Sequence, residues 1–202
     1  MFVQVIQGRV SDKDKVREVL ERWTTELGPT AKGWLGSTGG VTDDGRLIAL
    51  VRFESAEAAR ANSERPEQGA WWNDMAELFT DAPQFHDSEN VEVDTPGDPA
   101  TAGFVQVMQG HTKDPARTKE LMDADDTDWA SYRPDILGTV SVAHDEDAWT
   151  MAMYFTSEEA AREGEAKEPP PELQAMMEEM NALAIGEPDF FDLRDPWFQA
   201  PG

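Results

Sequence analysis

Polar side chains that could take part in chemistry lie within apolar, strand-like segments of this sequence. Gln7 follows Val5 and Ile6, Arg52 follows Val51, and His86 follows Phe85. Imidazole titrates near neutral pH, so His86 is a candidate general base. The alternative is a histidine at a strand edge facing solvent, because one histidine without a placed partner is not a catalytic constellation.

Similar residues recur about a hundred positions later. Gln109 corresponds to Gln7, and Tyr154 stands where Arg52 stands in the first half. A polar group among apolar neighbours must find a partner or line a cavity. Two interpretations stay open: an internal hydrogen-bond network that holds the two halves in register, or a pocket whose amides and phenol orient a small ligand.

A helical segment adds aromatic candidates. Trp71 and Met75 are spaced as in a buried helical stripe, which favours core packing, whereas Trp72 points to another side and is the better candidate for a pocket wall. Where the two halves differ, we expect one to keep a site and the other to act as its structural partner. The predicted site comprises catalytic His86, Gln7 and Tyr154 and substrate-binding Trp72, Arg52 and Gln109.

Composition narrows the classes of function. The chain has 202 residues and a net charge of −24, which would repel nucleic acid or an anionic membrane. It has no cysteine and three scattered histidines, so we expect no metal site, and His111 and His144 should lie at the surface. No apolar run approaches the ~20 residues of a membrane span and no signal peptide is visible, which favours a cytoplasmic location.

The sequence contains an internal repeat. Phe2-Val3-Gln4-Val5-Ile6-Gln7-Gly8 returns as Phe104-Val105-Gln106-Val107-Met108-Gln109-Gly110, at an offset of 102 residues. The same offset relates Phe53 to Phe155 and Ser55 to Ser157. We therefore predict two repeats, 1–94 and 104–202, joined by a linker at 95–103 that is rich in Pro, Gly and small residues.

Hydrophobic periodicity gives each repeat the element order βαββαβ, the ferredoxin-like α+β unit. In the first repeat the expected strands are 2–10, 34–41, 46–53 and 85–93, and the helices are 12–27 and 56–79, the second broken near Arg65-Pro66. The strand 46–53 is apolar on both faces and so requires a covering layer on each side. We expect the two sheets to meet face to face with the helices outside.

These features resemble the dimeric α+β barrel superfamily, and most closely its antibiotic-biosynthesis-monooxygenase-type branch. The resemblance rests on the first-strand motif, the hairpin at Asp43-Asp44-Gly45 and the segment 53–59. It implies that the tandem ferredoxin-like repeats form an intramolecular dimeric α+β barrel, a pseudo-dimer within one chain that is itself a monomer or a weak homo-oligomer.

Some members of that superfamily bind and degrade haem. The resemblance to them implies an Asn on the first strand and a Trp with an axial His on the second helix. This sequence has Gln7 and Gln109 at the first position and no histidine on either second helix. Because ferric haem depends on its proximal ligand, the sequence argues against haem, and no cofactor is expected.

The resemblance implies a protein that binds a small hydrophobic molecule, with cofactor-independent monooxygenation of an aromatic substrate as its enzymatic form. The alternative is a non-catalytic binding or stress-related protein whose pocket is filled by side chains. A third hypothesis is an interaction module that uses an exposed sheet edge. A cavity between helices and sheet would distinguish the first two.

Overall fold

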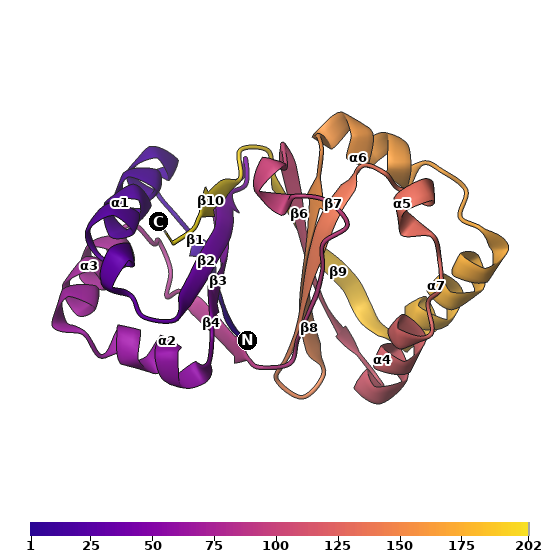
Figure 1. Cartoon of the computed structure of the whole chain (residues 1–202), viewed down its shortest axis with the longest axis horizontal. Coiled ribbons are helices and arrows are strands. Elements are labelled where there is room, and N and C mark those ends of the chain that lie inside the picture. The colour runs from indigo at the N-terminus through magenta and orange to yellow at the C-terminus, as the bar shows by residue number, and fades with distance from the viewer. Residues whose placement is uncertain (202) are drawn as a thin grey trace. The chain divides into compact units, whose positions relative to one another are not determined.

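The protein is described by a computed structural model over residues 1–201, and it divides into two compact units. The first unit comprises Met1–Val91 together with the C-terminal residues from Asp195, and the second comprises Glu92–Arg194. Each unit has one five-stranded sheet with helices over one face (Figure 1). The predicted tandem α+β architecture is therefore confirmed.

The first unit follows the predicted order of elements. Its elements are β1 (Phe2–Arg9), α1 (Lys13–Glu26), a 3-10 turn (Gly28–Thr30), β2 (Trp34–Val41), β3 (Arg46–Phe53), α2 (Ala56–Ser63), α3 (Pro66–Ala76), β4 (Gln84–Ser88) and β10 (Trp197–Gln199). Its strands lie in the order β10-β2-β3-β1-β4. The second helical region breaks where expected, because Pro66 has no N–H and is suited to the first turn of α3.

The second unit repeats this plan. Its elements are β5 (Val91–Asp94), a 3-10 turn (Pro99–Thr101), β6 (Phe104–Thr112), α4 (Pro115–Asp123), α5 (Trp129–Tyr132), β7 (Ile136–His144), β8 (Ala148–Phe155), α6 (Glu158–Glu165), α7 (Pro171–Leu183) and β9 (Ala184–Leu193). The strand order is β5-β7-β8-β6-β9. In this repeat the sequence pattern predicts one helix over 115–129 and a last strand over 190–193, whereas the structure has two short helices and a last strand that begins at Ala184.

Local details of the repeat are conserved between the units. Ser55 caps α2 by accepting a hydrogen bond from the Ala58 N–H, and Ser157 caps α6 in the same way. The pairing register shifts between Trp34 and Gly36 in β2 and between Ile136 and Gly138 in β7. Corresponding residues therefore carry the same bulge, which supports the alignment at an offset of 102.

The edge strands differ from the expected linear division of the chain. The segment predicted as one strand over 85–93 is β4 in the first sheet and β5 in the second, separated by a turn in which the Val91 N–H donates to the Glu89 carbonyl. The C-terminal β10 pairs with β2 in the first sheet. Thus β5 precedes the predicted linker at 95–103 but belongs to the second sheet, and β10 follows the linker but belongs to the first sheet.

The helix-facing core of the first unit is rich in tryptophan. Trp23 of α1 packs edge-on against Trp34 of β2, with ring centroids 4.7 Å apart, and lies 6.3 Å from the ring of Trp71 on α3. Asp12 begins α1 by accepting from the Lys15 N–H at 3.1 Å. In the second unit the corresponding core is smaller and consists of Phe104, Ile136, Phe155 and Ala161.

Within residues 1–201, no helix combines the length and the apolar composition that a membrane crossing requires.

The acidic excess leads to a prediction about stability. A net charge of −24 destabilises the compact state through self-repulsion, and salt shortens the range of that repulsion from about 30 Å at 0.01 M to about 10 Å at 0.1 M. We expect the melting temperature to rise by several degrees when NaCl is increased from 0.02 to 0.3 M, because each kcal/mol added to the free energy of unfolding raises it by roughly 2–4 °C. Differential scanning calorimetry would measure it, and a flat or falling melting temperature would contradict it.

Candidate functional site

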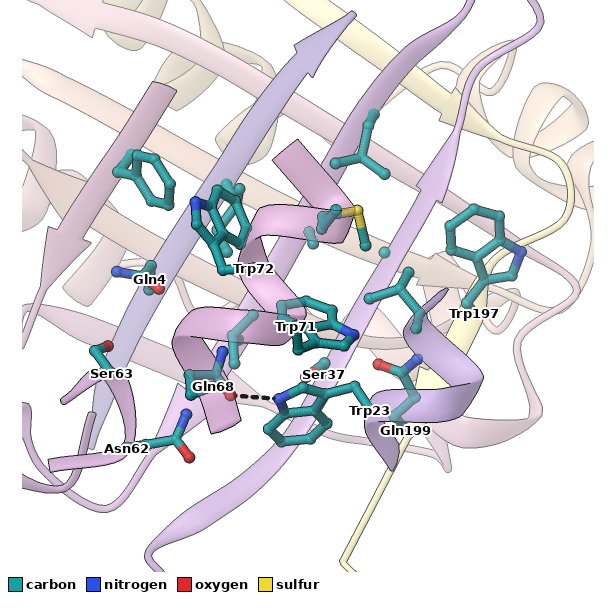
Figure 2. Close-up of a pocket in the computed structure, with 18 of the residues that line it drawn as sticks. Gln4, Trp23, Ser37, Asn62, Ser63, Gln68, Trp71, Trp72, Trp197 and Gln199 are labelled. Carbon is teal, nitrogen blue, oxygen red and sulfur yellow. Dashed lines mark hydrogen bonds between the residues drawn. The ribbon is translucent and has the colours of Figure 1, made fainter. Parts of the chain in front are cut away.

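A cavity of about 280 Å³ lies inside the first unit, between the helices and the sheet (Figure 2). Its roof comes from α1, α2 and α3, and its floor from the strands, including β10. The lining is mostly apolar and aromatic, with a few amide and hydroxyl groups. This composition is typical of small-molecule sites, in which a few polar groups orient an apolar ligand.

The floor is bare because the strands carry small residues where the helices pass over them. Ser37 and Gly39 of β2 and Ala49 of β3 share the helix-facing side. A Cβ at Gly39 would lie 2.9 Å from the Ile48 carbonyl oxygen and 3.0 Å from the Ala49 Cβ, so a larger residue does not fit there. The cavity therefore arises from residue choice on two neighbouring strands.

The tryptophans in the roof are fixed by hydrogen bonds. Trp23 Nε1 donates to Gln68 Oε1 at 2.6 Å, and Trp71 Nε1 donates to the Val19 carbonyl at 2.8 Å (Figure 2 draws the first of these). Buried indole N–H groups usually need such partners. These bonds link α1 to α3 and hold the roof above the bare floor.

One wall is an aromatic cluster. The ring of Trp72 lies 5.3 Å from that of Phe85 on β4, 6.2 Å from that of Phe79 and 6.0 Å from that of Trp71. Phe85 is 45 % exposed, so this wall reaches the surface. A flat aromatic ligand could stack on such a surface with offset or edge-to-face geometry.

The polar groups of the lining are uncharged. Gln4 donates to Asp87 at 2.9 Å, and Asn62 Oδ1 accepts from Arg65 at 2.9 Å. The oxygen of Gln68 is taken by Trp23, which leaves its amide nitrogen as the donor that side chain can offer a ligand. Among the described residues that line the cavity, none has an ionisable side chain. A charged ligand would therefore lose its hydration without gaining a counter-ion.

The structure places one predicted site residue of the first unit on the cavity. Trp72 forms its wall, whereas Gln7, Arg52 and His86 lie on the opposite face of the sheet. The reason is strand alternation: Ile6 and Phe85 pair with each other and face the cavity, so the next residues, Gln7 and His86, face away. Gln7 Nε2 donates to Gln84 Oε1 at 3.0 Å, a bond between two strands of the first sheet.

The predicted residues of the second unit also lie on the face away from the helices. Gln109 pairs with Thr150 and Tyr154 with Val105, and both alternate with residues that face the helices. Gln109 Nε2 donates to Thr150 Oγ1 at 3.0 Å. The structure therefore does not bring Gln109 and Tyr154 together with Trp72 in the cavity of the first unit, and their roles remain predictions.

The corresponding region of the second unit is an open depression of about 470 Å³ lined by charged groups. Arg162 bonds to Glu165 at 3.0 Å and also to Asp192, which accepts from Gln106 at 2.9 Å. Arg133 makes a buried ion pair with Asp135 at 2.8 Å. Gln174 stands at the position of Trp72, so the aromatic wall keeps only Phe190, the counterpart of Phe85.

The pair of Arg133 and Asp135 is held by competing effects. Burial by itself raises the pKa of Asp135, but the hydrogen bond and charge of Arg133 outweigh it and keep the pKa below its ordinary value of 3.8. The guanidinium passes over Gly164 of α6, where any Cβ would collide with it, and lies 5.6 Å from the centre of the Phe155 ring. Gly164 is thus required for this packing.

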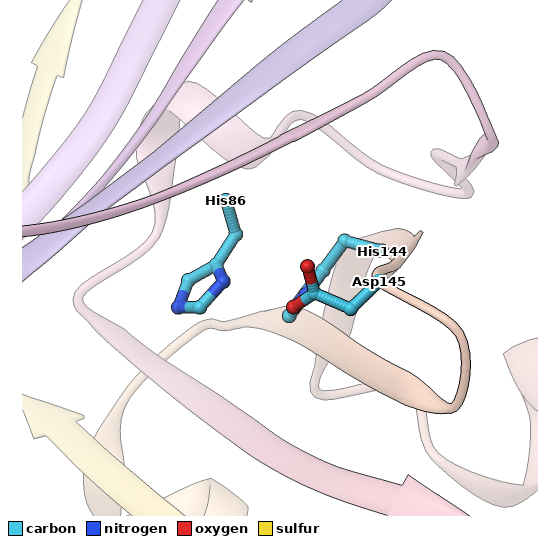
Figure 3. Close-up of side chains that lie close together, drawn as sticks. All are labelled: His86, His144 and Asp145. Atoms are coloured by element: carbon cyan, nitrogen blue, oxygen red, sulfur yellow. The ribbon is translucent and has the colours of Figure 1, made fainter.

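His144 is buried, and not at the surface as the sequence suggested. Its Nε2 lies 2.9 Å from Thr150 Oγ1 and its Nδ1 lies 3.0 Å from Asp145 Oδ2. Figure 3 shows His144 and Asp145 side by side at the end of β7. Thr150 Oγ1 also accepts from Gln109 Nε2 at 3.0 Å, so this hydroxyl links the imidazole to the Gln109 amide. His111 is exposed and pairs with Asp147, as expected for a surface residue.

Sequence reasoning missed several polar and aromatic residues of the cavity. Asn62 and Gln68 lie on surface-like helical segments, and Trp197 and Gln199 come from a three-residue strand at the C-terminus. A signal was present in the comparison of the repeats, because Asn62 aligns with Gly164 at the offset of 102. A polar residue in one repeat that aligns with an apolar residue or a glycine in the other indicates a position where the two units differ between helices and sheet.

Comparison with known proteins gives a consistent result for the fold. No family model matches the sequence, and the search of curated proteins found no match. Two solved structures described as "putative monooxygenase" are similar over 100 % of this chain. The protein from Lactobacillus acidophilus has 13 % identity, 97 % coverage of its own chain and a TM-score of 0.72, and that from Fusobacterium nucleatum has 8 %, 94 % and 0.76.

A third structure, described as an anthrone oxidase-like protein, is similar over 98 % of this chain and 93 % of its own, with 14 % identity and a TM-score of 0.70. At such identities the likeness shows the fold. The protein therefore shares with these structures a fold of two ferredoxin-like repeats in tandem, as the sequence repeat predicted.

Two glycines in helices should respond oppositely to alanine. Gly69 of α3 lines the cavity, and a Cβ there would have no atom within 4 Å. Gly69→Ala should therefore raise the free energy of unfolding by up to about 1 kcal/mol through helix propensity. Gly164→Ala, the matched change, should lower it because Arg133 must move. Urea unfolding would measure both, and equal signs would contradict the packing described.

The ion pair predicts a pH dependence. Because the folded pKa of Asp135 is depressed, its charge contributes stability that is present above pH 3.8 and is lost as pH falls through the folded value. Asp135→Asn should cost about 3–5 kcal/mol at pH 7, since Arg133 is left buried without a counter-charge. The difference from the unmodified protein should shrink towards pH 3. Urea unfolding across this range tests it, and a constant difference would refute the assignment.

Proposed function

We propose that the first unit binds a flat, uncharged, hydrophobic aromatic molecule in its cavity, and that the protein oxygenates this molecule without a cofactor. The observation that carries the proposal is the cavity itself, which combines an aromatic wall at Trp72 with an uncharged lining. The fold supports it, because similar structures are described as putative monooxygenases and as anthrone oxidase-like. The second unit has the role of structural partner.

The lining limits the ligand to a neutral molecule. An anion or cation would enter an apolar space without an ionic partner, at a cost of several kcal/mol. The protein's charge of −24 further disfavours the approach of anions. Amide groups from Gln68 and Asn62 lie at one end of the cavity and the aromatic wall at another (Figure 2). We infer that a carbonyl or hydroxyl group of the ligand lies at the amide end.

The proposed reaction needs only oxygen as a co-reactant. An activated methylene group that becomes a ketone, R₂CH₂ + O₂ → R₂C=O + H₂O, loses four electrons, which reduce dioxygen while one oxygen atom enters the product and the other leaves as water. The substrate must first enolise. A donor such as the Gln68 amide would stabilise charge developing on the enolate oxygen. The proton would pass to solvent, because no described lining residue has an ionisable side chain to accept it.

Non-catalytic binding is the second candidate, and the same absence of an ionisable group among the cavity's described lining residues favours it. General acid–base catalysis commonly contributes about 10²–10⁴-fold in rate. Without a base, turnover would depend on the acidity of the substrate. The two candidates share one binding site and differ in a single observable, the consumption of oxygen.

Anthrone is a suitable probe, since it is neutral, tricyclic and carries an activated methylene group. We expect it to bind in titration calorimetry and to consume one O₂ per ketone formed in an oxygen electrode. Trp72→Ala should weaken binding at least tenfold, because the stacking wall is lost. Trp129→Ala, a tryptophan of the second unit, is the matched control and should leave binding unchanged.

The variant His86→Ala tests whether His86 is the general base that the sequence predicted or lies outside the site, as its position on the sheet indicates. Since His86 lies on the face away from the cavity, this variant should retain both binding and any oxygen consumption. Loss of turnover with intact binding would show that the reacting group is elsewhere and would overturn the proposed site. Binding without oxygen consumption above the rate in buffer would leave the non-catalytic function.

A further inference from the structure

One wall of the cavity comes from the far end of the chain. Trp197 and Gln199 of β10 line the cavity, whereas every other lining residue lies between Gln4 and Phe85 (Figure 2). β10 pairs with β2 through Trp197 opposite Gly39 and Gln199 opposite Ser37. Residues directly opposite each other in an antiparallel pair lie on the same face. Trp197 therefore covers floor that Gly39 leaves bare.

The edge of β2 allows β10 to approach closely at Gly36. A Cβ at Gly36 would lie 2.7 Å from the Gln199 carbonyl oxygen, and Gly36 has φ +126°, a conformation that side chains rarely adopt. Both features require glycine. The chain thus brings β10 against β2 at a position where only a residue without a side chain allows the approach.

Few interactions other than the pairing hold Trp197 in place. Arg17 of α1 lies over its indole, 5.3 Å from the ring centre, and pairs with Asp195, which also lies 3.4 Å from Lys13. Asp195 is about half exposed, and exposed ion pairs contribute little. The Trp197 indole N–H is buried without a partner among the described residues. The wall is therefore fixed mainly by shape.

We propose that Trp197 determines the size of ligand that the cavity admits. This inference rests on the proposed function. The indole fills the space above Gly39 at one end of the cavity, so its removal would lengthen the apolar space by the extent of two fused rings. No neighbouring side chain on β2 can fill that space, since a larger residue at Gly39 would collide with Ile48 and Ala49.

The test compares affinities for a graded series of neutral probes: 2-naphthol with two rings, anthrone with three and 1-hydroxypyrene with four. Titration calorimetry gives Kd for each. In Trp197→Ala, the ratio of Kd for 1-hydroxypyrene to Kd for 2-naphthol should fall at least tenfold relative to the unmodified protein. Trp197→Phe keeps an aromatic packing group and should give an intermediate ratio, which protects the test if the alanine variant does not fold.

Phe198→Ala is the matched control, because Phe198 lies on the same strand but alternates to the other face. It should leave the ratio unchanged even if it loosens β10. Equal ratios in the Trp197 variants and the unmodified protein, or an equal shift in Phe198→Ala, would overturn the assignment of Trp197 alone. Failure of the unmodified protein to bind any probe would overturn the proposed function and this inference with it.

Discussion

The alternation of side chains across an antiparallel strand decides which residues of this protein can meet a ligand. In β1 and β3 the helix-facing set includes Gln4, Ile6 and Val51, while their immediate neighbours Gln7 and Arg52 face the other way. Two amides only three positions apart thus serve different surfaces. The composition of the site depends on this period of two, because consecutive residues of a strand lie on opposite faces of the sheet.

The two repeats share backbone features and differ in the side chains that lie between the helices and the sheet. Both keep the serine caps of α2 and α6 and the bulge at Gly36 and Gly138. Between helices and sheet, the first unit has indoles held by neutral hydrogen bonds, and the second has arginines held by carboxylates. In the second unit these charged groups share the depression with apolar residues such as Met153 and Phe190, so a neutral ligand there would meet ion-paired groups.

Periodicity and repetition predicted the order of elements and the helix break at Pro66, because both follow from local chemistry. The exchange of β5 and β10 was beyond such reasoning, since strands of four and three residues carry no pattern and their partners are distant in sequence. Helical spacing favoured Trp72 over Trp71 as a pocket residue, but both indoles line the cavity. It grouped His86 with Trp72 because it could not assign the face of an edge strand.

An unfilled apolar space is costly, and this cost bears on its meaning. At about 24 cal/mol for each Å³ of cavity, a space of 280 Å³ corresponds to an upper limit on the order of several kcal/mol, a large share of the stability of a typical domain. Larger residues on α3 would reduce it, since Gly69 has open space around it. The bonds from Trp23 to Gln68 and from Trp71 to Val19 instead hold the roof away from the floor. Binding of the ligand proposed above would offset this cost, which gives a physical reason for the first repeat to keep the space while ion pairs cross the second.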